Sequence, residues 1–281
     1  MSELDYRAIV DGFRADPRTF VSVERPHPDT AILRMQDPDN GNSMSGPMTV
    51  QLHDRLIETS RDPLLRTVII TGQDPQFSVG GDWQLMKKLA HEMIADAPEG
   101  AVAPWRWIRR FFGGIARTIQ QTDKVYIAAV NGAAAGVSLA FVFACDLILA
   151  SEKARLLTAF GRVGLVPEVG MSWYLTRRIG YQRALGLFIS NKVLTGQEAF
   201  EQGLVNEVTA HEQLIPRALE WAAMVRAQPE HAIEMAKPLL RGAADMGWHQ
   251  AMIAEEFAEP IAFSTKAQRD AVADFESRRK K

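Results

Sequence analysis

The chain has 281 residues, of which 47% are hydrophobic and 23% are charged, and its formal net charge is −2. This composition is typical of a globular protein with a large core, and it gives no reason to expect nucleic acid or an anionic membrane as a partner. The single cysteine, Cys145, excludes an internal disulfide and a cysteine-based zinc site, and no apolar run is long enough to span a bilayer. The first twenty residues do not resemble a signal peptide, so we expect a cytoplasmic protein.

The first part of the chain contains strand patterns and one well-marked helix. Segments 19–24 and 30–35 alternate apolar and polar residues, which predicts two strands joined by a turn. A polar loop spans 37–47, after which Ser45 or Gly46 caps a helix with Pro47 in its first turn. Residues 66–71 form a compact apolar run and predict a buried strand.

A glycine pair follows this strand in the stretch G-Q-D-P-Q-F-S-V-G-G-D-W. Gly80 and Gly81 allow the backbone to approach a ligand closely and to present N–H groups to it, although an ordinary glycine turn is the alternative. The spacing fits neither a phosphate loop nor a dinucleotide fingerprint. Asp82 is predicted to cap a helix that begins near Trp83.

Residues 87–121 read as mostly helical, with an interruption near A-D-A-P-E-G-A-V-A-P. The aromatic side chains of this segment are interpreted either as pocket lining or as core. They are Trp105, Trp107, Phe111 and Phe112. Its basic residues either face a phosphate or form an ordinary solvated helix face. They are Arg106, Arg109 and Arg110.

The central stretch, from residue 124 to 174, carries the clearest chemical signal. A buried strand over 125–130 breaks at Asn131 and Gly132 and leads into a helix that starts near Gly136. The side chains at this junction are small, so the backbone N–H groups stay accessible to a ligand. N–H groups at the start of a helix favour an anion or a developing oxyanion.

One carboxylate, Glu168, lies in a loop whose neighbours are nearly all apolar. Such surroundings disfavour the charged form, so its pKa is expected to rise toward the range of a general base. The alternative is a structural carboxylate that caps a helix or pairs with Arg162 or Arg177. Donors for an oxyanion together with one desolvated carboxylate favour an enzyme that removes a proton from the carbon next to a carbonyl group.

The last third of the chain is predominantly helical. A helix is expected over 177–190, followed by a helix that Gly203 ends and by a short strand. From residue 211 onward the pattern predicts four further helices, over 214–227, 230–244, 248–263 and 264–279.

Five motifs in this order resemble those of the crotonase (enoyl-CoA hydratase/isomerase) superfamily over residues 19–279. They are F-S-V-G-G-D, V-N-G-A-A-A-G-V-S, C-D-L-I-L-A, G-L-V-P-E-V-G and L-T-G-Q-E-A-F-E-Q-G-L-V-N-E-V. The resemblance implies an α/β fold, a spiral of ββα units, with a core over 1–208 that holds the acyl-CoA site and a helical oligomerisation region over 209–281. It further implies a homotrimer or a hexamer made of two trimers, and an acyl-CoA thioester as substrate with no separate cofactor.

The resemblance also assigns catalytic positions. The two oxyanion-hole amides belong to Gly81 and to Val137, which stands where the family usually has glycine. The two acid positions of the family's hydratases hold Ala140 and Phe160, neither of which can transfer a proton. Glu168 lies where peroxisomal-type Δ3,Δ2-enoyl-CoA isomerases keep their catalytic glutamate, so a single-glutamate isomerase is the function that the resemblance implies.

Substrate contacts are implied for two loops and for the helix start. The residues are Asn42, Ser43, Met44, Phe77, Ser78, Val79, Gly80, Asp82, Trp83, Gly136 and Phe160. Lys87 or Lys88, and Lys266 of the C-terminal helix, are candidates for contacts with the phosphates of coenzyme A.

Four other interpretations stay open. An enoyl-CoA hydratase-like protein with another acyl specificity is one, and a non-catalytic acyl-CoA binder is a second, because Val137 and Met171 replace small residues. An aryl-CoA dehalogenase is a third, although residues 111–115 lack its histidine. A serine hydrolase is the fourth, since G-V-S-L-A around Ser138 nearly matches a nucleophile elbow. The histidines that follow it are His211, His231 and His249.

Overall fold

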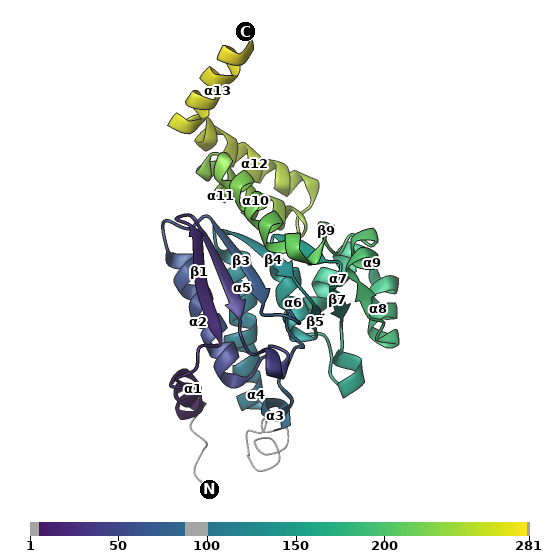
Figure 1. Cartoon of the computed structure of the whole chain (residues 1–281). Coiled ribbons are helices and arrows are strands. Elements are labelled where there is room, and N and C mark those ends of the chain that lie inside the picture. Colours follow the sequence, from purple (N-terminus) through teal and green to yellow (C-terminus); the bar gives the residue numbers. More distant parts are fainter. Residues whose placement is uncertain (1–5, 88–100, 280–281) are drawn as a thin grey trace. The chain divides into compact units, whose positions relative to one another are not determined.

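The computed structural model describes residues 6–87 and 101–279 of the chain. The chain divides into two compact units, Met1–Glu220 (unit 1) and Trp221–Lys281 (unit 2) (Figure 1). The boundary predicted from the resemblance, between residues 208 and 209, stays a prediction.

Unit 1 is built on a six-stranded sheet with the order β1-β2-β3-β4-β6-β9. Strands β1 and β2 are antiparallel, and every later neighbour is parallel. The strands are β1 (Val21–His27), β2 (Thr30–Met35), β3 (Thr67–Gly72), β4 (Val125–Val130), β6 (Leu147–Ser151) and β9 (Glu207–Thr209). All residues of β3 and β4 are buried, as expected for central parallel strands that are covered on both faces.

A second, three-stranded sheet lies at the carboxyl end of β4 and has the order β5-β7-β8. It consists of β5 (Ala133–Ala135), β7 (Arg155–Leu157) and β8 (Leu194–Thr195). Ala133 follows Val130 of β4 after a two-residue break at Asn131 and Gly132, so the chain passes directly from one sheet into the other. This passage places the start of α6 (Val137–Ala144) directly after β5.

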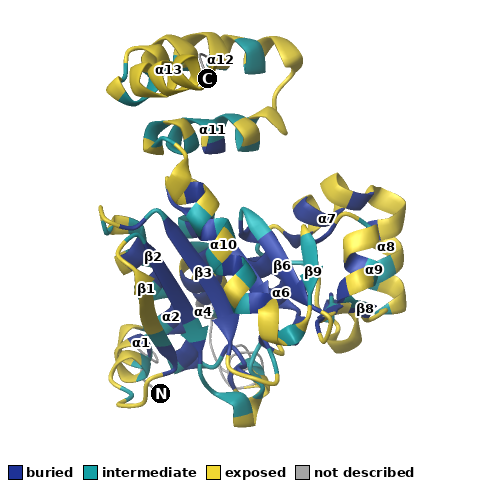
Figure 2. Cartoon of the chain, turned by 45° about the horizontal axis from the view of Figure 1, so that its top comes forward, coloured by how far each residue is buried: buried dark blue, intermediate teal, exposed yellow. Residues whose placement is uncertain are grey.

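Helices α2 (Gly46–Arg61) and α5 (Gly113–Gln121) pack against each other, and α2 also contacts β1 and β2. Ser45 caps α2 as predicted, because its side chain accepts a hydrogen bond from the Met48 N–H. Figure 2 shows strands β2 and β3 coloured as buried over most of their length. Helix α4 (Val102–Trp107) and the π-helical turn η3 (Ile108–Phe112) lead directly into α5.

The aromatic residues of this helical segment are mostly core. Trp107, Phe111 and Phe112 are buried, and burial of a side chain of this size contributes roughly 1.5–3 kcal/mol to folding. Trp105 alone among the four is exposed, with 57% of its surface accessible. The pocket-lining alternative is therefore wrong for the three buried residues.

The remaining helices follow in chain order. In unit 1 they are α1 (Tyr6–Arg14), η1 (Pro38–Asn40), α3 (Trp83–Lys87), η4 (Phe160–Val163), α7 (Met171–Ile179), α8 (Tyr181–Ser190), α9 (Gly196–Glu201) and η5 (His211–Gln213). Helix α10 (Leu214–Ala227) crosses the boundary between the units, and unit 2 continues with α11 (Glu230–Ala243), α12 (Trp248–Phe263) and α13 (Lys266–Arg279). The single helix predicted over 177–190 is wrong, because Gly180 separates α7 from α8.

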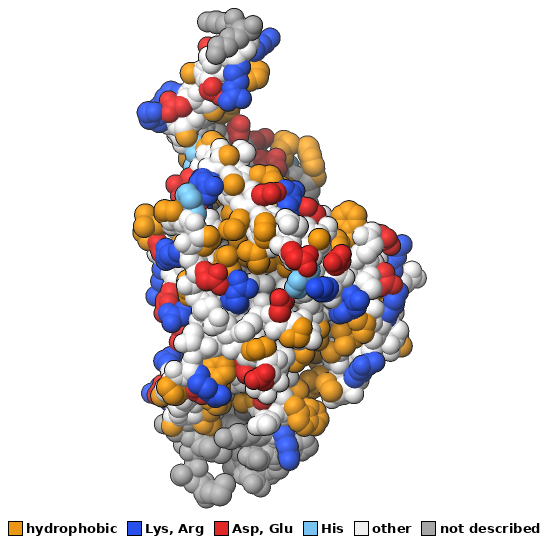
Figure 3. Space-filling view, in the orientation of Figure 1, with side chains coloured by type: hydrophobic (Ala, Val, Ile, Leu, Met, Phe, Trp, Pro, Cys, Tyr) orange, Lys and Arg blue, Asp and Glu red, His pale blue; other side chains and the backbone are white. Residues whose placement is uncertain are grey.

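The described part of the chain offers neither a membrane span nor a metal site. No helix there is long and apolar enough to cross a membrane, and no cluster of three or more His, Cys, Asp or Glu residues is arranged to hold a metal ion. On the face shown in Figure 3, basic and acidic side chains are interspersed.

Candidate active site

Two backbone segments from distant parts of the chain pair to form the first half of the site. The Ser78 N–H donates to the Ala133 carbonyl at 2.9 Å, and the Ala135 N–H donates to the Ser78 carbonyl at 3.1 Å. The loop after β3 is thereby fixed against β5. The glycine pair and the helix start, which the sequence placed in separate motifs, lie side by side.

Gly80 allows this close approach. Its φ is +95°, and a Cβ atom at this position would lie 2.5 Å from the Ala135 carbonyl oxygen. A side chain would therefore push the two segments apart, and the left-handed backbone would add strain to any L-residue other than glycine.

A buried hydroxyl pair strengthens the same contact. The Oγ atoms of Ser78 and Ser138 are 2.6 Å apart, and the Gly80 N–H donates to Ser78 Oγ at 3.3 Å. Ser138 is fully buried in this pair, which gives it a structural role. It is not the nucleophile of a triad with His211, because His211 bonds instead to Ser151 at 3.0 Å and to Asp74 at 3.1 Å.

The predicted oxyanion donors, the N–H groups of Gly81 and Val137, have no hydrogen-bond partner among the described residues. Their neighbours are held firmly: the Met44 N–H donates to the Gly80 carbonyl at 2.7 Å, and the Gly136 N–H donates to the Leu157 carbonyl at 3.1 Å. Val137 is the first residue of α6, where a helix always leaves N–H groups unpaired and where the dipole favours negative charge.

Glu168 lies in the loop between η4 and α7 and is half-buried. Desolvation by burial raises the pKa of its carboxyl from 4.5 to about 7. Within the described parts of the chain no donor or cation reaches this carboxylate, so the alternative pairing with Arg162 or Arg177 is not formed. The raised pKa expected from its apolar neighbours is confirmed.

The backbone around Glu168 is strained and fixed. Val169 adopts φ +56°, a conformation that a β-branched residue rarely adopts and that costs about 1–3 kcal/mol. The Met171 N–H donates to the Glu168 carbonyl at 3.0 Å, and α7, which Met171 begins, packs against α6. The loop of the carboxylate and the helix of the Val137 donor are therefore linked through helix packing.

The two hydratase acid positions are apolar and buried. Ala140 lies on α6 and is fully buried, and Phe160 begins η4 with 4% of its surface exposed. Neither position brings a second ionisable group to Glu168.

Most of the other predicted contact residues turn their side chains into the protein. Those of Asn42, Met44, Phe77 and Ser78 are at most 1% exposed. Asn42 binds the Gln73 and Gln76 carbonyls at 2.8 and 2.7 Å, which is a structural role. A contact of these residues with substrate would therefore use the backbone.

Of the remaining predicted contact residues, Ser43, Gly80 and Gly136 are also buried, and Asp82 is partly accessible. Asp82 caps α3 as expected, since the Leu85 N–H donates to its Oδ1 at 2.7 Å. Val79 and Trp83 are exposed. Lys88 lies outside the described residues, Lys87 is exposed, and Lys266 pairs with Asp270 at 2.5 Å.

Comparison with known proteins places this geometry in a family. Residues 29–281 match the family model described as enoyl-CoA hydratase/isomerase. The chain belongs to the enoyl-CoA hydratase/isomerase family. It therefore has the crotonase fold that the resemblance implied, and it is an enzyme-family member of the kind that handles acyl-CoA thioesters.

Relatives within the family differ in the reaction that they are named for. The chain is 28% identical over 211 residues to 1,2-epoxyphenylacetyl-CoA isomerase of Escherichia coli K12, covering 75% of this chain and 78% of the relative. It is 28% identical over 216 residues to 4-chlorobenzoyl coenzyme A dehalogenase-1 of Arthrobacter sp., covering 75% and 74%. The crystal structure of a probable enoyl-CoA hydratase/isomerase from Mycobacterium abscessus superposes with a TM-score of 0.83 at 25% identity, over 93% of this chain and 97% of that one. The names of these relatives do not decide which reaction the chain catalyses, and the residues of its site must do so.

Burial of Glu168 has a measurable effect on stability. Because the folded protein holds the Glu168 proton more tightly than the unfolded chain does, the free energy of unfolding should fall as pH rises from about 4.5 to about 7. Glu168→Gln should therefore be more stable than the wild type by about 3 kcal/mol at pH 8 and about equally stable at pH 4. Urea unfolding at both pH values measures this difference. A matched change at the exposed Glu152, Glu152→Gln, should show no such dependence on pH, and an unchanged or lower stability of Glu168→Gln at pH 8 would contradict the burial of the charge.

Proposed function

We propose that the chain is a Δ3,Δ2-enoyl-CoA isomerase that moves a double bond with one carboxyl group. The observation that carries this proposal is the desolvated carboxylate of Glu168, with a pKa of about 7 and no ionisable partner among the described residues. A base with a pKa near the working pH combines a useful fraction of the charged form with enough basicity to remove a weakly acidic proton.

The proposed reaction needs no second acid. The Glu168 carboxylate takes a proton from C2 of a 3-enoyl-CoA, and the electron pair moves into a dienolate whose oxygen receives hydrogen bonds from the Gly81 and Val137 N–H groups. The protonated carboxyl then delivers the same proton to C4, which leaves the double bond between C2 and C3. Glu168 ends in its starting state, so atoms and charges balance over the cycle.

The two N–H groups are suited to the dienolate because no described residue pairs with them and because the contacts around Gly80 and Gly136 fix their neighbours. Donors of this kind contribute roughly 3–4 kcal/mol each to transition-state stabilisation where such sites have been dissected. A donor that is already in place pays no reorganisation cost when charge develops.

Hydration of a double bond requires an activated water and a second proton-transfer group. Ala140 and Phe160, which occupy the two acid positions of the family's hydratases, supply neither. The same two residues that disfavour a hydratase are therefore expected to favour an isomerase.

The decisive assay compares two substrates in the wild type and in Glu168→Gln. Trans-3-hexenoyl-CoA should be converted to the conjugated thioester, crotonyl-CoA should stay unhydrated, and Glu168→Gln should lower the conversion about 10²–10⁴-fold because the base is lost. Absorbance of the conjugated enoyl group follows both reactions, and Glu152→Gln is the matched control with unchanged rate.

Two outcomes of that assay would contradict the proposal. Rapid hydration of crotonyl-CoA would mean that another carboxylate acts as the missing hydratase acid. Binding of both thioesters without any turnover would favour a non-catalytic acyl-CoA protein.

The Val137 donor has its own test because proline is tolerated at the first residue of a helix. Val137→Pro removes the N–H and should lower kcat about 10²–10³-fold, whereas Val137→Ala keeps the N–H and should retain most of the activity. Circular dichroism of both variants checks that α6 is intact. Equal activity of the two variants would exclude the Val137 N–H as an oxyanion donor.

The proposal includes the homotrimer or hexamer and the cytoplasmic location expected from the sequence. Several large apolar side chains of unit 2 are exposed in the single chain, which supports burial against other copies. They are Leu240, Trp248, Phe257, Ile261, Phe263, Val272 and Phe275. Light scattering should give a mass of three or six chains, and a monomer at micromolar concentration would contradict this part.

A further inference from the structure

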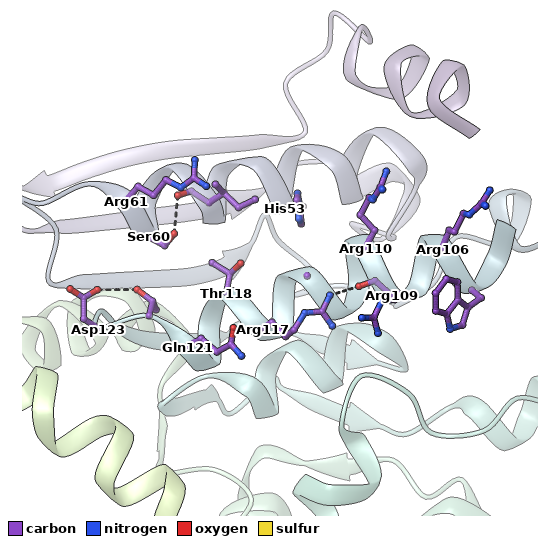
Figure 4. Close-up of a pocket in the computed structure, with 14 residues that line it drawn as sticks. His53, Ser60, Arg61, Arg106, Arg109, Arg110, Arg117, Thr118, Gln121 and Asp123 are labelled. Atoms are coloured by element: carbon purple, nitrogen blue, oxygen red, sulfur yellow. Dashed lines mark hydrogen bonds between the residues drawn. The ribbon is translucent and has the colours of Figure 1, made fainter. Parts of the chain in front are cut away.

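Unit 1 contains a cavity of about 990 Å³ between α2 on one side and the helical segment α4–η3–α5 on the other (Figure 4). None of its lining residues belongs to the candidate active site. Five arginines line it, and we name it the arginine groove after them: Arg61, Arg106, Arg109, Arg110 and Arg117. Three of these arginines stand out in the sequence as a basic run, whereas no local pattern indicates the wall that α2 supplies.

The arginines of the groove lack carboxylate partners among the described residues. Arg109 lies over the Trp105 ring at 5.6 Å, Arg110 lies over the Tyr6 ring at 5.6 Å, and Arg117 donates to the Arg109 carbonyl. Elsewhere in unit 1 arginines are commonly paired. Examples are Arg14 with Asp54, Arg18 with Asp16, Arg25 with Asp62, and Arg34 with Glu24.

The acidic groups close to the groove are already engaged. Asp123, the one acid in its lining, pairs with Lys124 at 3.1 Å. Asp54, beside His53 of the lining, accepts hydrogen bonds from Arg14 and is 3.1 Å from His53. Burial raises the pKa of Asp54, but hydrogen bonds from His53 and Arg14 outweigh it, so the pKa lies below its usual value. The positive charge of the arginines is therefore not neutralised from within the groove.

Helical spacing gathers four of these charges on one face. Arg106, Arg110 and Arg117 recur at intervals of about one or two turns, with Arg109 beside them, while Phe111 on the same segment faces the core. Like charges one turn apart repel each other. The buried aromatic face holds the helix in place despite this repulsion, and a bound anion would relieve it.

Two glycines keep the floor of the groove open. A Cβ atom at Gly114 would lie 2.9 Å from the His53 ring, and one at Gly113 would lie 2.8 Å from Arg117 Nη1. Glycine in the middle of a helix is unfavourable for helix formation. At these two positions it makes room for the side chains that line the groove.

Size and chemistry restrict the ligand. At about 1.5 Å rise per residue, the arginines from 106 to 117 extend over roughly 16 Å, which exceeds a single phosphate. Guanidinium groups bind phosphate oxygens in a bidentate manner, and the exposed indole of Trp105 offers an aromatic face at one end. We propose that the arginine groove binds a nucleoside diphosphate, with the phosphates on Arg109 and its neighbours and the base against Trp105.

Coenzyme A also carries a nucleoside diphosphate, so two sources of this chemistry must be distinguished. The groove shares no residue with the oxyanion donors or the Glu168 loop, and we assign it to a free nucleotide rather than to the nucleotide of the thioester. The site therefore stands independently of the isomerase activity.

Isothermal titration of the full chain with ADP tests the proposal. The wild type should bind one ADP per chain, and Arg109→Glu and Arg106→Glu should each weaken binding at least tenfold. Arg183→Glu, an equal charge change at an exposed residue of α8, is the matched control and should bind as the wild type does. Thermal unfolding of each variant confirms that it is folded, and Arg109→Gln gives a second, milder change that should also weaken binding.

Two further titrations test whether the groove takes a free nucleotide or the nucleotide of coenzyme A, and whether the base contributes to binding. Saturating crotonyl-CoA should leave ADP binding unchanged, and inorganic pyrophosphate should bind more weakly than ADP while keeping the same dependence on Arg109. The proposal is overturned by absence of ADP binding, by equal binding in Arg109→Glu, or by displacement of ADP with crotonyl-CoA. Pyrophosphate binding as tight as that of ADP would exclude the contact of the base with Trp105.

Discussion

The close contact between Ser78–Gly80 and β5 is the constraint on which the rest of the site depends. Gly80 brings its backbone so near to Ala135 that a single added carbon would collide with a carbonyl oxygen. The hydrogen bonds of Ser78 and the buried hydroxyl pair with Ser138 hold this contact. The N–H groups of Gly81 and Val137 flank this contact and have no hydrogen-bond partner among the described residues, and we propose that they receive a developing oxyanion.

The second constraint is electrostatic and works against stability. The Glu168 carboxylate is desolvated without a compensating donor, and Val169 beside it holds a strained backbone conformation. Both features cost folding free energy, and both are expected at a site where basicity and position serve chemistry. Ala140 and Phe160 are buried and add no charge at the two hydratase acid positions.

Much of the fold could be predicted from local patterns, and the failures have physical causes. Helices 214–227 and 248–263 were predicted with their observed bounds because their patterns are long. Strands β5, β7 and β8 have two or three residues each, too short for any alternation to show. The sequence also predicted a raised pKa for Glu168 from its neighbours alone. It could not show that Asn42 and Met44 point inward, nor that His211 meets Asp74 across 137 positions, because such contacts depend on tertiary packing.

The proposed mechanism depends on the Glu168 carboxyl group, which carries a proton from C2 to C4 of the substrate. The most direct test uses a 3-enoyl-CoA with two deuterium atoms at C2, converted in ordinary water and analysed by mass spectrometry and NMR. If Glu168 returns the atom that it removed, a substantial share of the product should carry deuterium at C4. Product with only solvent hydrogen at C4, formed at an undiminished rate in Glu168→Gln, would contradict it.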